Sequence, residues 1–227
     1  MAIRNLERTT LRAQCLDGLR SAITSGQLPA GHHLVETELS EAFGVSRGTL
    51  REAMRRLEQE GLLVAGPRGQ LRVREIDERE IAQLYEVRAA LEVLAARSLC
   101  RQPDCRARLA TLRARLEHLH GVEGRLGEQI EADLAFHRTL CELSGNPALL
   151  SSWLALEGPI RITIMHAGIE RALHNMASKR HAHLLEVLSQ GDPRRIEAVF
   201  TEHMDEAARR LMWAMEARSP HPSDRKN

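Results

Sequence analysis

The sequence predicts a mainly α-helical protein of two domains, and three observations support this fold class. Apolar side chains recur at three- and four-residue intervals over most of the 227 residues, which is the period of an amphipathic helix. Strand signals are nearly absent, apart from one short hairpin within the first third of the chain. After Glu75 the pattern contains helices alone. We therefore expect a domain at 1–76, a second domain at 77–217 and a polar, disordered tail at 218–227.

The composition excludes several classes of protein. Lys and Arg (32) nearly balance Asp and Glu (31), which excludes a globally basic surface for nucleic acid but not a local basic face. Aromatic residues make up only 3%, too few for the stacking platforms of single-strand or RNA binders. No apolar run approaches the roughly 20 residues of a membrane helix, and no signal peptide is recognisable, so no membrane partner is expected. The four cysteines form no CxxC pair, as expected of reduced thiols in a cytoplasmic protein.

The first third of the chain is expected to contain three helices followed by a hairpin. The second and third helices are separated only by Gly44 and Val45, and Ser46 is the expected N-cap of the third. Helices, a tight turn and then a hairpin follow in the order of a winged helix-turn-helix. The helices are expected at residues 5–26, 36–43 and 46–60, and the strands at 62–65 and 71–74.

The third helix has the side-chain distribution of a DNA-reading helix. Arg47, Arg51 and Arg55 fall at i, i+4 and i+8 and share one face, while leucine and methionine occupy the opposite face. Such a helix suits the major groove of double-stranded DNA. Arg68 and Arg72 of the hairpin suit phosphates or the minor groove. In an isolated helix these arginines could simply form a solvated face. The order of elements and the second basic cluster, on the hairpin, favour DNA binding instead.

The C-terminal helices carry ionisable residues on their apolar faces. At a period of 3.6 residues these side chains face the same interior as the leucines around them. Burial without partners would cost several kcal/mol for each of them, so we expect the side chains to converge. They are Arg88, Asp133, His137, His181 and His203.

A divalent metal would satisfy most of this set. Asp133 and His137, at i and i+4, are a two-ligand arrangement that helices offer to metals. His181 and His203 would complete three nitrogens and one oxygen, which suits Zn, Ni, Mn or Fe(II). Arg88 would offer its guanidinium to a carboxylate. Other interpretations stay open: hydrogen-bonded core histidines, a helix cap at Asp133, and an Arg88 paired with Asp133 or Glu92.

Residues 16–74 resemble the DNA-binding domain of the GntR family of bacterial transcription regulators. The similarity lies in the turn GVSR, the helix LREAMRRLEQEGL and the wing PRG. Thr37 stands where many members have arginine, and Gly48 where threonine is common, which bears on the operator sequence rather than on DNA binding. The resemblance implies DNA contacts from Arg47, Thr49, Arg51, Arg68 and Gly69.

Residues 77–215 resemble the FCD ligand-binding domain of the FadR-type branch of that family, and the modest length favours its VanR-like variant. The similar segments are EVRAALE, DLAFHRTL, KRHAHLLEVLSQGD and EAVFTEHM, which contain Arg88, Asp133, His137, His181 and His203. The resemblance implies that the aspartate and the three histidines bind a divalent metal, with an organic-acid effector beside it. Arg180 stands where glutamate is common. Glu157-Gly158-Pro159 is expected to interrupt a helix, and Arg161 after it is a second candidate for the effector carboxylate.

Together these observations predict a DNA-binding regulator, a repressor, with a metal-linked acid sensor. A homodimer would place two recognition helices in successive major grooves of a near-palindromic operator. Three alternatives remain for the metal: a hydrolytic enzyme, a sensor of the metal itself, and a structural ion with a separate effector pocket. No general base accompanies the ligands in the sequence, and a winged helix has no place in the hydrolase, so we predict no enzyme.

Overall fold

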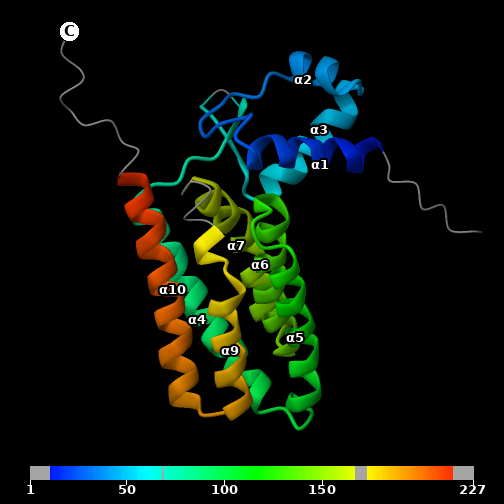
Figure 1. Cartoon of the computed structure of the whole chain (residues 1–227). Helices are drawn as coiled ribbons and strands as arrows, with labels where there is room; N and C mark the ends of the chain where they lie inside the picture. Colours follow the sequence, from blue (N-terminus) through cyan, green and yellow to red (C-terminus); the bar gives the residue numbers. More distant parts are fainter. Residues whose placement is uncertain (1–10, 68, 167–172, 217–227) are drawn as a thin grey trace, which may run out of the picture. The chain divides into compact units, whose positions relative to one another are not determined.

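The computed structural model describes residues 11–67, 69–166 and 173–216 (Figure 1). Contacts divide the chain into two units, and the boundary lies between Glu75 and Ile76. We call them the N-terminal unit and the helix bundle and describe each by itself. The predicted fold class, mainly α with one hairpin, is confirmed. The tail 218–227, predicted to be disordered, lies outside the described residues.

The N-terminal unit has the element order of a winged helix-turn-helix. Gly44 ends the second helix in a left-handed conformation with φ +62°, which glycine adopts without strain. Ser46 caps the third helix, because its side-chain oxygen accepts a hydrogen bond from the Thr49 backbone N–H at 3.2 Å. The two strands pair antiparallel. The elements are α1 (Leu11–Thr24), α2 (Glu36–Phe43), α3 (Arg47–Gln59), β1 (Leu63–Ala65) and β2 (Leu71–Val73).

The third helix is held by its apolar side. It packs against α1 and α2 and buries four side chains at the spacing of one helical face, which leaves the opposite face to solvent. The buried residues are Leu50, Ala53, Met54 and Leu57.

The remaining helices form one bundle, in which the long helices lie side by side (Figure 1). α4 packs against α10, α6 and α7, and α5 packs against α6 and α9. Asp77 caps α4 by accepting a hydrogen bond from the Glu80 N–H at 2.7 Å. The helices are α4 (Glu78–Cys100), α5 (Cys105–Gly121), α6 (Leu126–Leu143), α7 (Pro147–His166), α9 (Ser178–Gln190) and α10 (Pro193–Glu216).

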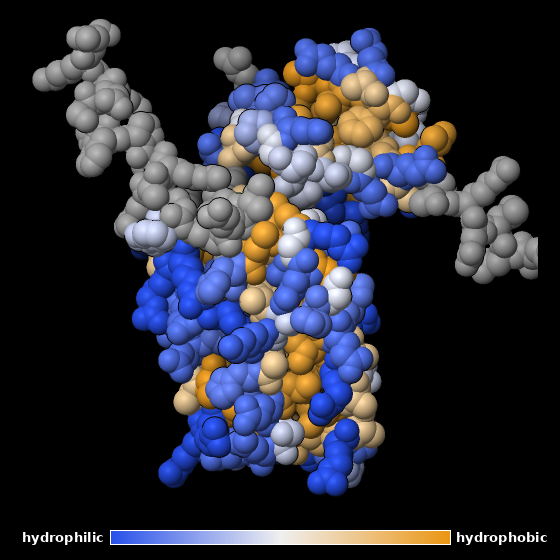
Figure 2. All heavy atoms as spheres, viewed as in Figure 1, coloured by the Kyte–Doolittle hydropathy of each residue, from blue (hydrophilic) through white to orange (hydrophobic). Residues whose placement is uncertain are grey.

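The core of the bundle is apolar but contains a charged centre. Phe136, Trp153 and Phe200 are among its largest fully buried side chains. On the face shown in Figure 2, hydrophilic side chains predominate over the bundle and hydrophobic surface is confined to patches. Arg88 and Glu92 are nevertheless buried inside, together with the aspartate and two of the histidines singled out above. Within the described ranges, none of the helices combines the length and apolar character that a membrane span requires.

The break expected at residues 157–159 is wrong, because α7 runs through it from Pro147 to His166. Pro159 has no N–H to donate to the preceding turn, which normally destabilises a helix interior. Here buried side chains on both sides, Trp153 and Ile160, hold the helix in the core. Packing therefore outweighs the local preference of proline for a helix end.

Candidate metal centre and nucleic-acid interface

The structure brings the three predicted histidine ligands together from three helices, and the fourth predicted ligand, Asp133, lies beside two of them. α6 supplies Asp133 and His137, α9 supplies His181 and α10 supplies His203. His181 Nε2 lies 3.0 Å from His137 Nε2 and 2.9 Å from Asp133 Oδ1. One ligand nitrogen of each of the three histidines lies within 4.8 Å of the others. Two atoms that bind one zinc ion at the usual bond length of about 2.0–2.2 Å lie roughly 3 to 3.6 Å apart. The separations of 3.0 and 2.9 Å are close to this range.

The hydrogen bonds of the two buried histidines determine which ring nitrogens carry hydrogen. His181 Nδ1 lies 3.1 Å from the Ala177 carbonyl oxygen, and His137 Nδ1 lies 2.5 Å from Glu92 Oε2. A carbonyl and an ionised carboxylate only accept hydrogen bonds, so both Nδ1 atoms must donate. In the neutral rings the two Nε2 atoms are then bare, and they face each other beside the Asp133 oxygen. With both rings neutral, three acceptors converge there and fit a divalent cation. With a hydrogen on His181 Nε2, the 2.9 Å contact is a hydrogen bond to Asp133.

The electrostatics favour the metal-binding forms of Asp133, His137 and His203. Burial alone would raise the pKa of Asp133, but the hydrogen bond and charge of His181 outweigh it and lower the pKa to about 2. Burial lowers the pKa of His137 by more than the neighbouring Glu92 raises it. Burial and then the charge of His181 hold the pKa of His203 well below its ordinary value. An ionised aspartate and neutral histidines are the ligand forms that bind metal.

Glu92 is a further member of this centre, which the sequence analysis considered only as a partner for Arg88. Its carboxylate is fully buried, and it accepts hydrogen bonds from Arg88 Nε at 2.8 Å and Trp153 Nε1 at 3.1 Å. Burial would raise its pKa, but His137 and Arg88 outweigh burial and lower the pKa to about 2. A carboxylate on the outer nitrogen of a ligating histidine fixes the tautomer and the ring orientation.

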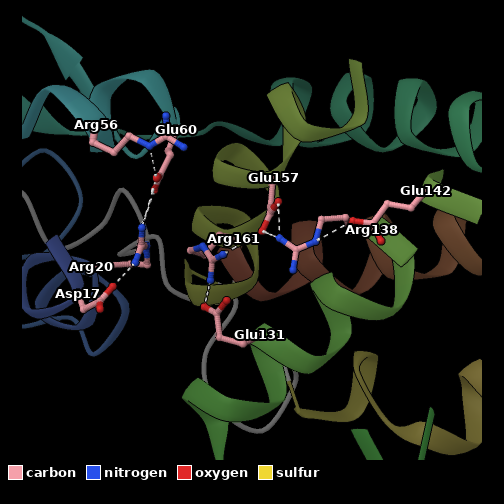
Figure 3. Close-up of polar contacts among 9 residues, drawn as sticks. All are labelled: Asp17, Arg20, Arg56, Glu60, Glu131, Arg138, Glu142, Glu157 and Arg161. Atoms are coloured by element: carbon pink, nitrogen blue, oxygen red, sulfur yellow. Dashed lines mark hydrogen bonds and ion pairs between the residues drawn. The ribbon is translucent and has the colours of Figure 1, made fainter. Parts of the chain in front are cut away.

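Both arginines predicted to receive an effector carboxylate are already paired within the chain. Arg88 is only 3% exposed, and it forms its ion pair with the buried Glu92. Arg161 is also buried and forms ion pairs with Glu131 and Glu157, and Arg138 brings a second guanidinium to Glu157 (Figure 3). A ligand would have to displace one of these carboxylates, so neither contact favours the effector role.

The predicted DNA-reading face of α3 is exposed in the N-terminal unit. Arg47, Arg51 and Arg55 all lie at the surface. Arg51 Nε donates to Glu36 Oε2 at 2.7 Å, which orients the guanidinium, and the Thr49 hydroxyl lies 3.0 Å from Ser46 Oγ. A groove of about 770 Å³ runs between α3 and the hairpin, and Arg51 and Arg55 are among the residues that line it.

The hairpin and the end of α3 complete this surface. Gly69 is exposed at the tip with φ +76°, and Arg72 pairs with Glu75 at 3.1 Å. Arg68 lies outside the described residues. Arg20 of α1 connects to Glu60 at 2.9 Å, and Glu60 also pairs with Arg56, which fastens the end of α3 to α1 (Figure 3).

Comparison with known proteins gives matches to both units. The model for the FCD domain matches residues 83–206, and that for bacterial regulatory proteins of the gntR family matches residues 11–73. A probable D-xylose utilization operon transcriptional repressor of Paenarthrobacter nicotinovorans is 29% identical over 203 residues, which cover 88% of each chain. The Nta operon transcriptional regulator of Aminobacter aminovorans is 31% identical over 160 residues, 70% of this chain and 74% of that one.

Solved structures agree on the fold. A GntR transcriptional regulator from Rhodococcus sp. RHA1, itself called putative in its description, superimposes with a TM-score of 0.71 at 20% identity over 89% of this chain and 98% of that one. The matched families and these relatives are transcription regulators and not enzymes. The chain thus belongs to the GntR family of bacterial transcription regulators, with a helix-turn-helix DNA-binding domain followed by an FCD domain.

Proposed function

We propose that this regulator is a homodimeric repressor whose affinity for operator DNA is controlled by a small organic acid bound beside a divalent metal. The observation that carries the proposal is the convergence of the potential ligands Asp133, His137 and His181 inside the bundle of a chain that also has a DNA-reading helix. Two relatives are named as operon repressors, which supports repression rather than activation. Because bacterial operators lie in the cytoplasm, we assign the regulator to that compartment.

The ligands would be Asp133, His137, His181 and His203, and this set of three nitrogens and one oxygen suits Zn, Ni, Mn or Fe(II). When bound, the metal supplies a Lewis-acidic centre with open positions for a carboxylate oxygen. Glu92 and the Ala177 carbonyl orient two of the imidazole rings, and the surrounding apolar core excludes water.

The proposal is tested by operator binding with and without acid. We expect one acid from a panel of small carboxylates to weaken operator binding by about 5- to 150-fold in the metal-loaded protein and not after EDTA treatment. The operator is first selected from random duplexes, and affinity is measured by gel shift. An effect of the acid that survives EDTA would instead favour a structural metal with a separate effector pocket.

In the DNA complex, Arg47 and Arg51 would read bases, with Thr49 beside them, while Arg72, Arg68 and Gly69 would contact the phosphate backbone. Glu36 holds Arg51 through Nε alone and leaves its two terminal nitrogens available for a base edge.

Replacing Arg51 by alanine should therefore cost about 1–3 kcal/mol of operator binding and relax one base preference. Arg56→Ala is the matched control, since Arg56 lies on the same helix, is equally exposed and pairs with Glu60 off the reading face. Gel shifts with the selected operator measure both variants. Equal losses in the two would contradict the assignment of Arg51 to base reading.

The homodimer is supported by large apolar side chains that remain exposed on the bundle. Val87 and Leu94 lie seven residues apart on one face of α4, and they are 50% and 45% exposed. Leu154 lies on α7, which packs against α4, and it is 43% exposed. Exposed apolar surface of this kind suits contact with another protein, and a second copy would supply the second recognition helix.

A further inference from the structure

Two cysteines lie against each other at the turn between α4 and α5. Cys100 is the last residue of α4, and Cys105 is the first residue of α5. Two backbone hydrogen bonds close the turn, from Gln102 N to Leu99 O and from Cys105 N to Gln102 O, each at 3.1 Å. A side-chain hydrogen bond joins the two thiols. The fold therefore keeps two thiol groups in contact, although four residues separate them in the chain.

Both thiols of this pair are accessible to a small oxidant, in contrast to the other two cysteines of the chain. Cys100 and Cys105 are partly exposed, whereas Cys15 and Cys141 are at most 2% exposed. Both side chains of the pair also pack against the apolar core, which holds the two sulfurs in place. Oxidation to a disulfide requires access for the oxidant and a second thiol within reach. Of the four cysteines, only this pair meets both conditions.

The two sulfurs have different environments, which assigns them different roles in an oxidation. Burial, and then the charge and hydrogen bond of Cys105, raise the pKa of Cys100 to about 12, so Cys100 stays a neutral thiol. Cys105 begins α5, and the N-terminal end of a helix stabilises a negatively charged sulfur. Arg108 forms an ion pair with Asp104 at 2.8 Å, which offsets the carboxylate next to Cys105 in the chain. Cys105 is therefore the attacking thiolate and Cys100 the resolving thiol.

The neutral thiol of Cys100 also makes a contact that depends on its hydrogen. Its S–H donates to the Leu188 carbonyl oxygen, which lies 3.5 Å from the sulfur. Leu188 is among the last four residues of α9, whose carbonyl groups have no partner inside a helix. A disulfide sulfur carries no hydrogen, so oxidation ends this contact between α4 and α9. Because α9 also supplies His181, the oxidation state of the pair reaches a helix that carries a candidate metal ligand.

We propose that Cys100 and Cys105 form a reversible oxidation site at which hydrogen peroxide produces a disulfide within the chain. The Cys105 thiolate attacks one oxygen of hydrogen peroxide, the O–O bond breaks, and hydroxide leaves while Cys105 becomes a sulfenic acid. The Cys100 sulfur then attacks the Cys105 sulfur, the S–O bond breaks, and the thiol proton leaves with the oxygen as water. Two thiols and one peroxide thus give one disulfide and two water molecules. The inference does not depend on the proposed function.

The test treats the reduced full-length protein with hydrogen peroxide and maps its cysteines by mass spectrometry. Trypsin cleaves after Arg101, between the two cysteines, so a disulfide joins the peptides 98–101 and 102–106. We expect this joined product, lighter by two hydrogen atoms than the two peptides together. The buried Cys15 and Cys141 are the controls within the same digest and should stay reduced. Dithiothreitol should restore both thiols of the pair, since exchange with an added thiol reverses a disulfide.

Two serine variants test the assigned roles. In Cys100→Ser, peroxide should leave Cys105 as a sulfenic acid that dimedone traps, because the resolving thiol is gone. In Cys105→Ser, Cys100 should remain a thiol at the same peroxide concentration. The inference is overturned if peroxide leaves the wild-type pair reduced, oxidises Cys15 or Cys141 equally fast, or joins two chains on a non-reducing gel. The wild-type digest decides even where a variant does not fold, as judged by circular dichroism.

Discussion

The zinc-loaded protein is expected to lose about 3–4 kcal/mol of stability when EDTA removes its metal, since a ligand present at 100 to 1,000 times its Kd stabilises the folded state by that amount. For a bundle of this size the melting temperature should fall by roughly 6–16 °C. The physical reason is local: two histidine nitrogens 3.0 Å apart, and an aspartate oxygen 2.9 Å from one of them, lose the cation that they would share.

Circular dichroism before and after EDTA treatment measures the effect, and added zinc should restore the melting temperature. His181→Ala is the control: it should melt low from the start and not respond to EDTA. Identical melting curves for loaded and stripped wild-type protein would contradict the metal centre.

Glu92→Gln tests the orienting hydrogen bond of the same centre. The amide oxygen can still accept a hydrogen bond from His137 Nδ1 but lacks the negative charge of the carboxylate, so zinc affinity should fall about 10- to 100-fold. Competition with a chromophoric chelator measures the affinity. Glu128→Gln, an exposed glutamate on α6 paired with Arg125, is the matched control and should bind zinc as the wild type does. Equal affinity in both variants would show that Glu92 does not orient the ligand.

Arg88→Met should destabilise the protein by about 3–5 kcal/mol, because it leaves the charge of Glu92 buried without its guanidinium partner. Urea unfolding followed by circular dichroism measures the loss. The double variant with Glu92→Gln should recover part of it, since the uncompensated charge is then absent. A fully stable Arg88→Met protein would contradict the structural role and return Arg88 to the role of carboxylate receptor.

The helix patterns predicted most of the architecture, because both the core of α3 and the spacing of Asp133 and His137 follow directly from 3.6 residues per turn. The convergence of ligands from α6, α9 and α10 followed from the cost of burying each one alone. The sequence could not decide between two partners for Arg88 and offered none for Arg161, since which carboxylate lies nearest depends on which helices pack together. The sequence offered Asp133 or Glu92 for Arg88, and the structure has Glu92.

The same limit applies to the continuity of α7 and to the role of Glu92 in the centre. Local chemistry at Pro159 predicts an interruption, and only the burial of Trp153 and Ile160 against other helices explains why none occurs. The hydrogen bond from Trp153 to Glu92 joins residues 61 positions apart in the chain. The spacing of residues within one helix cannot predict such a contact.

The unequal burial of the four candidate ligands has a kinetic consequence. Asp133, His137 and His181 are at most 4% exposed, and His203 on α10 is the least buried of the four. Exchange of a bound ion would therefore begin with His203 and require α10 to move away from the other three ligands, an opening that competes with the packing of α10 on α4 and α9. Slow exchange of this kind suits a resident ion that outlasts many cycles of DNA binding. The faster-exchanging signal would then be the acid and not the metal.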